Sequence, residues 1–293
     1  MPQSALSGWA ERAWIGLIRV TPLRAYTSLI RVVSGIPLPP GLRTPVFGTI
    51  ARRMGIDLVE AEGAVEEYRC FGELFVRPLR PGLRPVDPAV DAVVSPVDGS
   101  VSGIGTVRRG GLIQAKGIEY SLGELVADEG LAGALDGGCY LTLYLRPRDY
   151  HRIHSPIDAR VVALRQVAGR LFPVKPYMVR SLQGLYVRNE RLVFELEADM
   201  GRAALVCVAA AGVGNISTEV ADLNGTGARD RANGVRAVRL ERRVARGEEV
   251  ARFNLGSTVI MVFPPGKVDL TTLAPGAMLR VGQRVGRILQ PGR

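Results

Sequence analysis

The chain has 293 residues, of which 47% are apolar and 23% charged, enough for one large folded domain or a domain with an appendage. The 38 Lys and Arg residues exceed the 28 Asp and Glu residues, giving a formal net charge of +10. This charge suits an anionic lipid surface or an acidic substrate, or simply an arginine-rich composition. No basic motif with interleaved aromatic residues is present, so we do not expect nucleic acid as a partner.

Several classes of protein are excluded by motifs that the sequence lacks. Its cysteines, Cys70, Cys139 and Cys207, are widely spaced and include no C-x-x-C pair. This argues against a disulfide framework and a zinc site and predicts reduced thiols in a cytosolic protein. A P-loop, an H-E-x-x-H motif and a complete dinucleotide-binding fingerprint are also missing. No run of 18 apolar residues occurs, and charged residues interrupt the first apolar stretch. We therefore expect neither a membrane-spanning helix nor a signal peptide.

Residues 1–75 differ in composition from the rest of the chain. The stretches "WAERAWIGLIRV" and "LRAYTSLIRVVSGIPLPP" place apolar residues among arginines at helical spacing, and both tryptophans, Trp9 and Trp14, lie here. A second helical stretch is expected from about Pro45 to Cys70. Tryptophan and arginine on an amphipathic helix suit a membrane surface, although a helix packed on its own core shows the same pattern. We predict that this region is helical and membrane-associating.

Residues 76–293 form the predicted catalytic domain. The proline-rich "RPLRPGLRPVDPAV" opens it and cannot continue a helix. A helix with Ser121 and Glu124 as its capping box should end before Gly137. Apolar runs with turn signals between them predict strands, among them 139–145, 191–197, 203–211 and 257–263. Neither a regular strand–helix alternation nor an internal repeat is apparent. The predicted fold class is α+β, with a β-rich catalytic core of short, mostly antiparallel strands after the helical region.

Both histidines of the chain, His151 and His154, lie in the segment "RDYHRIHSP". Histidine titrates near neutral pH, and this segment follows the predicted strand 139–145, where functional loops often begin. In an extended chain the two side chains would point to opposite faces, whereas in a helical turn or tight loop they would share one. The alternative to a catalytic role is a pair of structural, hydrogen-bonded histidines.

Two other stretches contain candidate catalytic residues. In "SPVDGSV", Asp98 either bonds its own backbone in a β-turn or holds an imidazole in one tautomer. In "RFNLGSTVIMVF", Ser257 follows a glycine at the head of an apolar strand. A base nearby would make it a nucleophile, although this is not the G-x-S-x-G elbow of hydrolases. Because Gly256 leaves the backbone free to bend, the hydroxyl can also attack the Gly256 carbonyl. The resulting ester can eliminate, which breaks the chain and leaves a pyruvoyl group.

Together, "SPVDGSV", "RDYHRIHSP" and "NLGST" resemble the phosphatidylserine decarboxylase family. That family is marked by an aspartate in a PVDG-like turn, a D-Y-H-R-x-H-x-P segment and a terminal L-G-S-T, in this order. The stretches "FGELFVRPLRPG", "AKGIEYSLGEL", "GRLFPV" and "RGEEVARFNLGSTVIMVF" are also similar. The resemblance therefore covers about residues 71–263, and residues 1–70 match only in their helical, membrane-associating character.

The resemblance implies a self-cleavage triad in which Ser257 is the nucleophile, His154 the base and Asp98 the group that orients His154. It places His151 nearer to the decarboxylation step. Cleavage between Gly256 and Ser257 would give a beta chain, 1–256, and an alpha chain, 257–293. The alpha chain would begin with a pyruvoyl group, a covalent cofactor derived from Ser257. This group would form a Schiff base with phosphatidylserine, and loss of carbon dioxide would yield phosphatidylethanolamine. No metal is implied.

The resemblance also implies a homodimer of the two-chain unit. In a bacterium the expected location is peripheral, on the cytoplasmic face of the inner membrane, where phosphatidylserine makes the surface anionic. Three alternatives remain: a serine hydrolase that uses Asp98, His154 and Ser257 without cutting itself, a non-catalytic β-rich binding module, and a related decarboxylase of another serine lipid such as archaetidylserine. Chain cleavage would separate the decarboxylases from the first two, and headgroup and tail selectivity would separate the lipid substrates.

Overall fold

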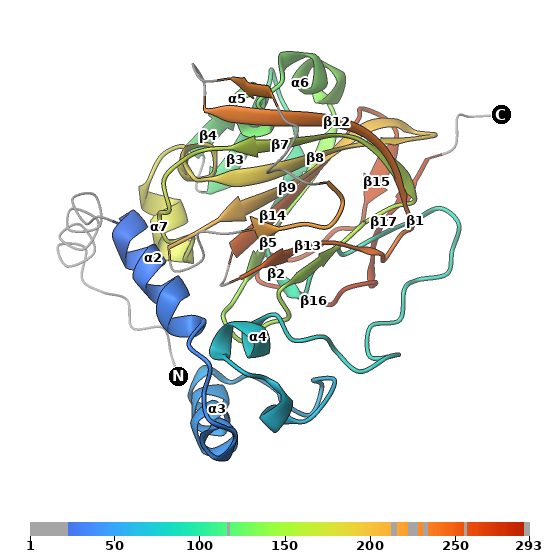
Figure 1. Cartoon of the computed structure of the whole chain (residues 1–293). Coiled ribbons are helices and arrows are strands. Elements are labelled where there is room, and N and C mark those ends of the chain that lie inside the picture. The colour runs from blue at the N-terminus through green and yellow to red at the C-terminus, as the bar shows by residue number, and fades with distance from the viewer. Residues whose placement is uncertain are drawn as a thin grey trace.

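The computed structural model describes residues 23–115, 118–211, 216–221, 228–230, 234–254 and 257–289 (Figure 1). Its largest element is a nine-stranded sheet with the order β11-β12-β7-β8-β9-β14-β5-β2-β16, in which all neighbouring strands run antiparallel. The short strands and the few helices confirm the predicted α+β class.

The strands of the large sheet are β2 (Gly99–Thr106), β5 (Cys139–Leu145), β7 (Ala159–Val167), β8 (Arg191–Ala198), β9 (Gly201–Ala209), β11 (Ala228–Asp230), β12 (Val235–Val244), β14 (Ser257–Phe263) and β16 (Met278–Leu279). The smaller sheets contain β1 (Ala92–Val94), β17 (Arg284–Ile288) and β15 (Val268–Leu270); β10 (Ile216–Ser217), β13 (Glu249–Phe253) and β6 (Arg152–His154); and β3 (Gly111–Ala115) with β4 (Ile118–Ser121). Two predicted strands, 139–145 and 257–263, have the predicted bounds. The other two are shifted by one or two residues at their ends.

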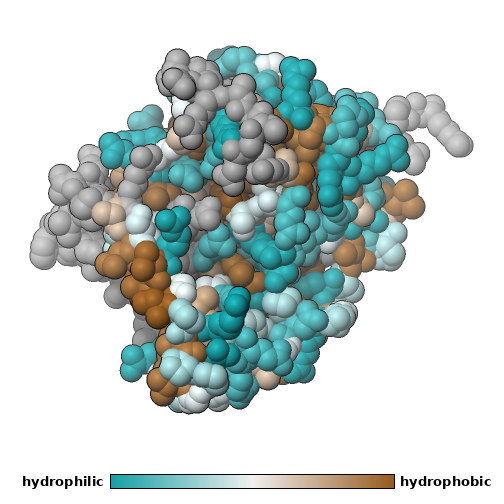
Figure 2. Space-filling view, in the orientation of Figure 1, coloured by the Kyte–Doolittle hydropathy of each residue, from teal (hydrophilic) through white to brown (hydrophobic). Residues whose placement is uncertain are grey.

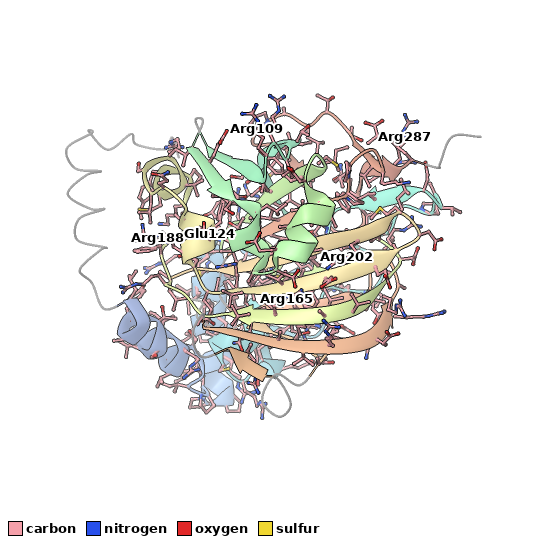
Figure 3. The ribbon with its side chains drawn as sticks, turned by 90° about the horizontal axis from the view of Figure 1, so that it is seen from above. Arg109, Glu124, Arg165, Arg188, Arg202 and Arg287 are labelled. Atoms are coloured by element: carbon pink, nitrogen blue, oxygen red, sulfur yellow. The ribbon has the colours of Figure 1, made fainter. Side chains whose placement is uncertain are left out.

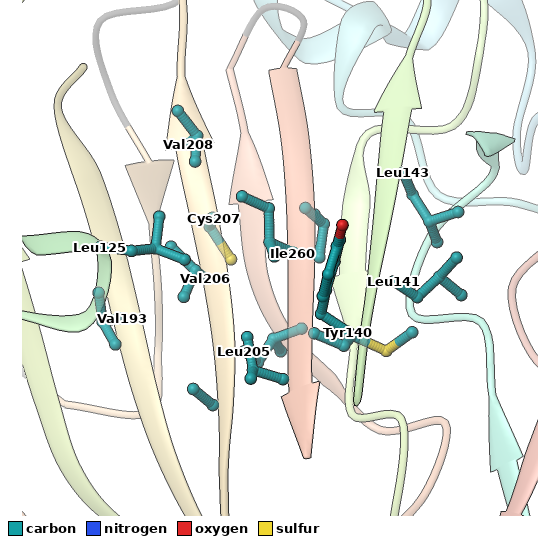
Figure 4. Packing of buried hydrophobic residues seen from close by; sticks show 14 of the residues in the cluster. Leu125, Tyr140, Leu141, Leu143, Val193, Leu205, Val206, Cys207, Val208 and Ile260 are labelled. Atoms are coloured by element: carbon teal, nitrogen blue, oxygen red, sulfur yellow. The ribbon is translucent and has the colours of Figure 1, made fainter. Parts of the chain in front are cut away.

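The centre of the core is β14 with its neighbours β9 and β5 (Figure 4). Every residue of β14 from Thr258 to Phe263 is buried, so both faces of this strand are covered. A strand covered on both faces reads as a continuous apolar run rather than as an alternation, which explains the sequences "AALVCVAAA" and "STVIMVF". Ser257 thus lies where the most deeply buried strand of the sheet begins.

The N-terminal helices are α2 (Leu23–Ser34), α3 (Pro40–Met54) and α4 (Phe71–Phe75), and they lie at one end of the molecule in Figure 1. The expected helix from Pro45 to Cys70 is largely wrong. Gly55 takes the left-handed conformation, with φ +74°, and ends α3, and only a 3₁₀ turn, η1 (Val65–Glu67), occurs before α4. Trp9 and Trp14 lie outside the described residues. Among those described, no helix is both long and apolar enough to cross a bilayer.

The N-cap half of the capping box predicted at Ser121 is present, but it starts a shorter helix than expected. The Ser121 hydroxyl accepts a hydrogen bond from the Glu124 N–H at 3.2 Å and caps α5 (Leu122–Val126). Ala127, with φ +53°, ends α5, and Asp128 then caps a second helix, α6 (Glu129–Leu135). Two further short helices, α7 (Pro176–Ser181) and α8 (Leu185–Arg188), were not predicted.

Ion pairs connect the N-terminus of α6 to the large sheet. Arg165 on β7 contacts both the capping Asp128 and Glu195 on β8, and Arg202 on β9 contacts Glu195 from the other side. Figure 3 shows Arg165 and Arg202 on these strands beneath the α5–α6 region. From the N-cap of α6 across β7, β8 and β9 the four charges alternate in sign, so each charge that is removed from water has an opposite charge beside it.

The structure contains an internal repeat that the sequence did not reveal. The segments "VSPVDGSV" (94–101) and "HSPIDARV" (154–161) form equivalent turns that bond to each other. The Val94 N–H donates to the Pro156 carbonyl at 3.0 Å, and the His154 N–H donates to the Pro96 carbonyl at 2.8 Å. These bonds are reciprocal, as expected for two copies related by an approximate two-fold axis.

Each turn of the repeat is hydrogen-bonded to a second segment nearer the C-terminus. This segment is "GQRVGRI" (282–288) for the first copy and "GEEVARF" (247–253) for the second. The Gly282 N–H donates to the Ser95 carbonyl at 3.0 Å, and the Gly247 N–H donates to the Ser155 carbonyl at 2.9 Å. Asp98 and Asp158 likewise each accept a backbone N–H at 2.9 Å, from Val281 and Arg246 respectively. Seven of the fifteen paired residues are identical, but they are divided between two short segments that lie far apart in the chain, which explains why the repeat is not visible in the sequence.

Candidate active site

The histidine segment lies beside the strand that leads into the Gly256–Ser257 bond. β6 pairs with β13, and the Phe253 N–H donates to the His151 carbonyl at 2.9 Å. The chain then continues from β13 to β14, where Ser257 pairs with Leu145 on one side and Ala209 on the other. Gly256 and the Ser257 side chain lie outside the described residues. The backbone alone brings the start of β14 and both histidines to the same end of the sheet.

His154 is held in one tautomer by a backbone carbonyl. Its Nδ1 lies 2.8 Å from the carbonyl oxygen of Gly247, which can only accept, so Nδ1 carries the proton. Its Nε2, 3.2 Å from the hydroxyl of Tyr150, therefore has the lone pair and accepts from that hydroxyl. Burial lowers the pKa of His154 below its ordinary value of 6.5. The ring is thus neutral near pH 7, with its basic nitrogen available for a proton.

Only glycine fits at the residue that orients His154. Gly247 has a φ of +83°, and a Cβ there would lie 2.4 Å from Cγ2 of Val86. Any larger residue would strain the backbone and move the carbonyl that fixes the His154 ring. This requirement explains the glycine of the "RGEEV" stretch.

His151 is fully buried and is held in the same way. Its Nδ1 lies 2.8 Å from the Asp149 carbonyl, and Nε2 has no hydrogen-bond partner among the residues that the structure describes. The ring packs against Phe75 of α4, with 4.1 Å between the ring centroids. Burial lowers the pKa of His151 to about 3, so this ring is also neutral near pH 7. It presents an unpaired, buried lone pair.

Asp98 lies near His154 but forms no hydrogen bond with either histidine among the described contacts. Its carboxylate accepts from Nε of Arg84 at 3.0 Å, from Nη2 of Arg84 at 2.5 Å and from the Val281 N–H at 2.9 Å. The Nδ1 of His154 is hydrogen-bonded to the Gly247 carbonyl. The arginine holds Asp98 because a buried carboxylate needs a countercharge. That Asp98 orients His154 stays a prediction.

Sequence reasoning missed the residues that support the histidines: Phe75, Arg84, Tyr150 and Gly247. Tyr150 lies between Asp149 and His151 in the singled-out segment and could have been found there. Phe75 occurs in "FGELFVRPLRPG", one of the stretches that carried the resemblance, and Arg84 occurs in the proline-rich "RPLRPGLRPVDPAV". Neither residue was given a role. Among the described residues, no group of three His, Cys, Asp or Glu side chains is arranged to hold a metal ion.

A serine at the start of a buried strand and a neutral imidazole beside the preceding strand are the two kinds of group that nucleophilic catalysis uses. The family model described as phosphatidylserine decarboxylase matches residues 71–287. Similar proteins include the phosphatidylserine decarboxylase proenzymes of Anaeromyxobacter sp. (strain K), 43% identical over 94% of this chain and 98% of the relative, and of Myxococcus xanthus (strain DK1622), 37% identical over 95% and 99%. That of Halorhodospira halophila is 40% identical over 98% of both chains. The chain belongs to the phosphatidylserine decarboxylase family.

The ion pair between Arg84 and Asp98 should contribute strongly to stability, because their side chains are only 9% and 11% exposed. We expect Arg84→Met to lower the free energy of unfolding by about 3–5 kcal/mol, since it leaves a buried carboxylate without its countercharge. Urea unfolding in a Ser257→Ala background, which removes the expected nucleophile, measures this.

The control is Arg284→Met, which breaks an ion pair with Asp91 whose side chains are 35% and 41% exposed. A surface pair should cost less than about 1 kcal/mol. Equal losses in the two variants would contradict a buried pair at Asp98.

Buried, neutral His151 should make the protein sensitive to acid. The unfolded chain binds a proton at the ordinary pKa of 6.5, whereas the folded chain binds it only near 3. Stability is therefore complete above pH 6.5 and falls as the pH drops from 6.5 toward 3. In the Ser257→Ala background, the free energy of unfolding should fall between pH 7.5 and pH 5 by about 2 kcal/mol less when His151 is replaced by Gln. Urea unfolding at pH 7.5 and pH 5 measures it, and parallel losses in both proteins would contradict the buried neutral state.

Proposed function

We propose that this protein cuts its own chain between Gly256 and Ser257, converts Ser257 to a pyruvoyl group and decarboxylates phosphatidylserine to phosphatidylethanolamine. The observation that carries the proposal is the pairing of the histidine segment with β13, the strand that leads into Ser257, in a member of this family. His154 of this segment is neutral and has its lone pair on Nε2. The word proenzyme in the names of the relatives supports the same chemistry.

Maturation begins when His154 Nε2 takes the proton of the Ser257 hydroxyl. The oxygen attacks the Gly256 carbonyl carbon, and the C–N bond between the residues breaks as an ester forms. Loss of the α-proton of Ser257 then expels the Gly256 carboxylate from Cβ. The new N-terminus rearranges to an imine, which water hydrolyses with release of ammonia. Every step needs only a base, an acid and water, and the neutral imidazole of His154 suits the first of them.

The residues around Ser257 fit the resulting group. When present, the pyruvoyl group supplies an electrophilic ketone that binds the substrate amine and accepts the electrons of the breaking carbon–carboxylate bond. His151 offers a buried Nε2 with no partner among the described residues, which can accept a hydrogen bond from the substrate. The buried strand β14 and Phe75 exclude water, which favours loss of the carboxylate charge.

We also propose that the protein binds anionic membranes peripherally, at the cytoplasmic face of the inner membrane. Apolar side chains on and just after α2 are exposed: Tyr26, Leu29, Val32, Val33 and Ile36, by 48–61%. Figure 2 shows apolar surface over α2 and α3. An exposed apolar patch of this kind, in a chain with a net charge of +10, supports binding to anionic lipid. The homodimer implied by the resemblance stays a prediction.

Self-cleavage is tested by the intact mass and N-terminal analysis of the purified protein. We expect two chains broken between Gly256 and Ser257, the shorter one beginning with a pyruvoyl group, and release of carbon dioxide from phosphatidylserine. His154→Ala should slow cleavage by about 10²–10⁴-fold through loss of the base. A single uncut chain that is active would contradict the proposal and favour the serine hydrolase.

The repeat supplies a matched control for Asp98 in the same experiment. Asp158 caps the equivalent turn but is exposed. Asp98→Asn should slow cleavage, whereas Asp158→Asn should leave its rate unchanged. Equal rates in both variants would remove Asp98 from the cleavage machinery.

Membrane binding is tested by flotation with vesicles that contain phosphatidylserine. Leu29→Gln/Val32→Gln should lower the partition coefficient at least about tenfold, because each buried side chain contributes roughly 1.5–3 kcal/mol. Val59→Gln/Val90→Gln changes side chains that are 72% and 92% exposed but lie outside the patch, and should have no effect. Equal binding by both double variants would contradict a role for α2.

A further inference from the structure

Arg77 is a buried arginine whose charge has no partner in the described part of the protein. Only 3% of the residue is exposed. Nη2 lies 3.4 Å from the Arg148 carbonyl, at the limit of a hydrogen bond, and Nε and Nη1 have no partner among the described residues. Burial lowers the pKa of Arg77, which reflects the unfavourable desolvation of its charge. A guanidinium in this state destabilises the fold unless an anion joins it.

Other buried arginines of the protein do have partners. Arg165, 8% exposed, forms ion pairs with two carboxylates, and Arg191, 4% exposed, donates hydrogen bonds to four backbone carbonyls. Those side chains are explained by the fold itself. Arg77 is not, which suggests a ligand.

Arg77 lines a cavity of about 400 Å³, bounded by the loop after α3, the histidine segment and the chain around Leu279. Its wall contains four carboxylates. Glu60 and Asp98 contact Arg84, and Asp149 contacts Arg146, whereas Asp57 accepts the Val59 N–H. The wall has five arginines against four carboxylates, and neither Arg77 nor Arg148 forms an ion pair with a described residue. The cavity therefore has a net positive charge, which suits an oxyanion.

Neither histidine lines the cavity, but residues of its wall lie next to both: Tyr150 next to His154, and Arg77 close enough to His151 that its charge adds to burial in lowering the pKa of that ring. Tyr150 is in its wall, and the Tyr150 hydroxyl lies 3.2 Å from Nε2 of His154. Phe75, two residues before Arg77, packs against the His151 ring. A volume near 400 Å³ lies within the range of small-molecule sites and can take a lipid headgroup but not its acyl chains.

We propose that Arg77, with Arg148 beside it, binds the phosphodiester of the serine lipid headgroup in this cavity. The inference rests on the proposed function and deepens it, since it makes Arg77 a specificity-determining residue. A guanidinium fork matches two phosphate oxygens. In phosphatidylserine the phosphate is only a few bonds from the amine, so an oxyanion held at Arg77 keeps the reacting part of the headgroup beside His151. Free serine lacks this contact.

The test compares the cleaved wild-type enzyme with Arg77→Met and Arg80→Met, using phosphatidylserine in detergent micelles and release of carbon dioxide. Arg80 is an exposed arginine of the same segment. We expect Arg77→Met to raise KM about ten- to hundredfold, as for a lost hydrogen bond to a charged group, with a much smaller change in kcat. Arg80→Met should match the wild type. Thermal unfolding should show an equal or higher Tm for Arg77→Met, because it removes an unpaired buried charge.

Two competitors distinguish the phosphate from the serine carboxylate. Glycerophosphoethanolamine has the phosphodiester without a carboxylate, and serine has the carboxylate without a phosphate. Arg77→Met should weaken inhibition by glycerophosphoethanolamine and leave inhibition by serine unchanged. A wild-type enzyme that glycerophosphoethanolamine does not inhibit, or a variant that loses affinity for serine instead, would overturn the proposal.

An unchanged KM, or a lower Tm with loss of kcat alone, would also overturn it. If Arg77→Met does not fold, Arg77→Lys is measured in its place. We expect Arg77→Lys to raise KM by a smaller factor. A KM equal to that of the wild type would contradict the inference. A wild-type protein that stays uncut and releases no carbon dioxide would instead refute the proposed function itself.

Discussion

The site depends on two turns that bond to each other across the repeat. The His154 N–H donates to Pro96, and the Val94 N–H donates to Pro156. Within the turns, the hydroxyls of Ser95 and Ser155 are buried and donate to the carbonyls of Val97 and Ile157 at 2.7 Å. Because buried backbone groups must stay paired, neither turn can move without leaving groups of the other unpaired. The backbone of His154 is thus fixed by the half of the fold that supplies Asp98.

The two copies of the repeat differ where the chemistry is proposed. Val94 stands at the place equivalent to His154, and the exposed Asp158 stands at the place equivalent to the buried Asp98. The segment from α4 to Arg84 covers only one side of this pair: Phe75 packs on His151, the Val76 carbonyl accepts from Arg152, and Arg84 holds Asp98. The two copies of the repeat are alike in backbone, but the site is asymmetric. The segment from α4 to Arg84 buries His151 and Asp98, whereas Asp158 in the other copy stays exposed.

Much of this arrangement could be predicted from the sequence, because its signals are local. The apolar runs predicted β5 and β14, and the motifs identified the histidine segment, the Asp98 turn and the start of β14. The bonds that orient the histidines were missed because their acceptors are the backbone carbonyls of Asp149 and Gly247, which leave no side-chain pattern. The break between α5 and α6 was missed because Ala127 takes a left-handed conformation that its residue type does not suggest.

The carbonyl partners of the histidines also determine their charge. A carboxylate at Nδ1 would favour the protonated ring, whereas a carbonyl fixes the tautomer without stabilising a positive charge as strongly. Burial then keeps both rings neutral, at the cost of basicity. In the proposed maturation this cost is tolerable for His154, because a base that acts once in the life of each molecule does not need a high rate. His151 would act in every turnover, and its complete burial keeps water from competing with the substrate for Nε2.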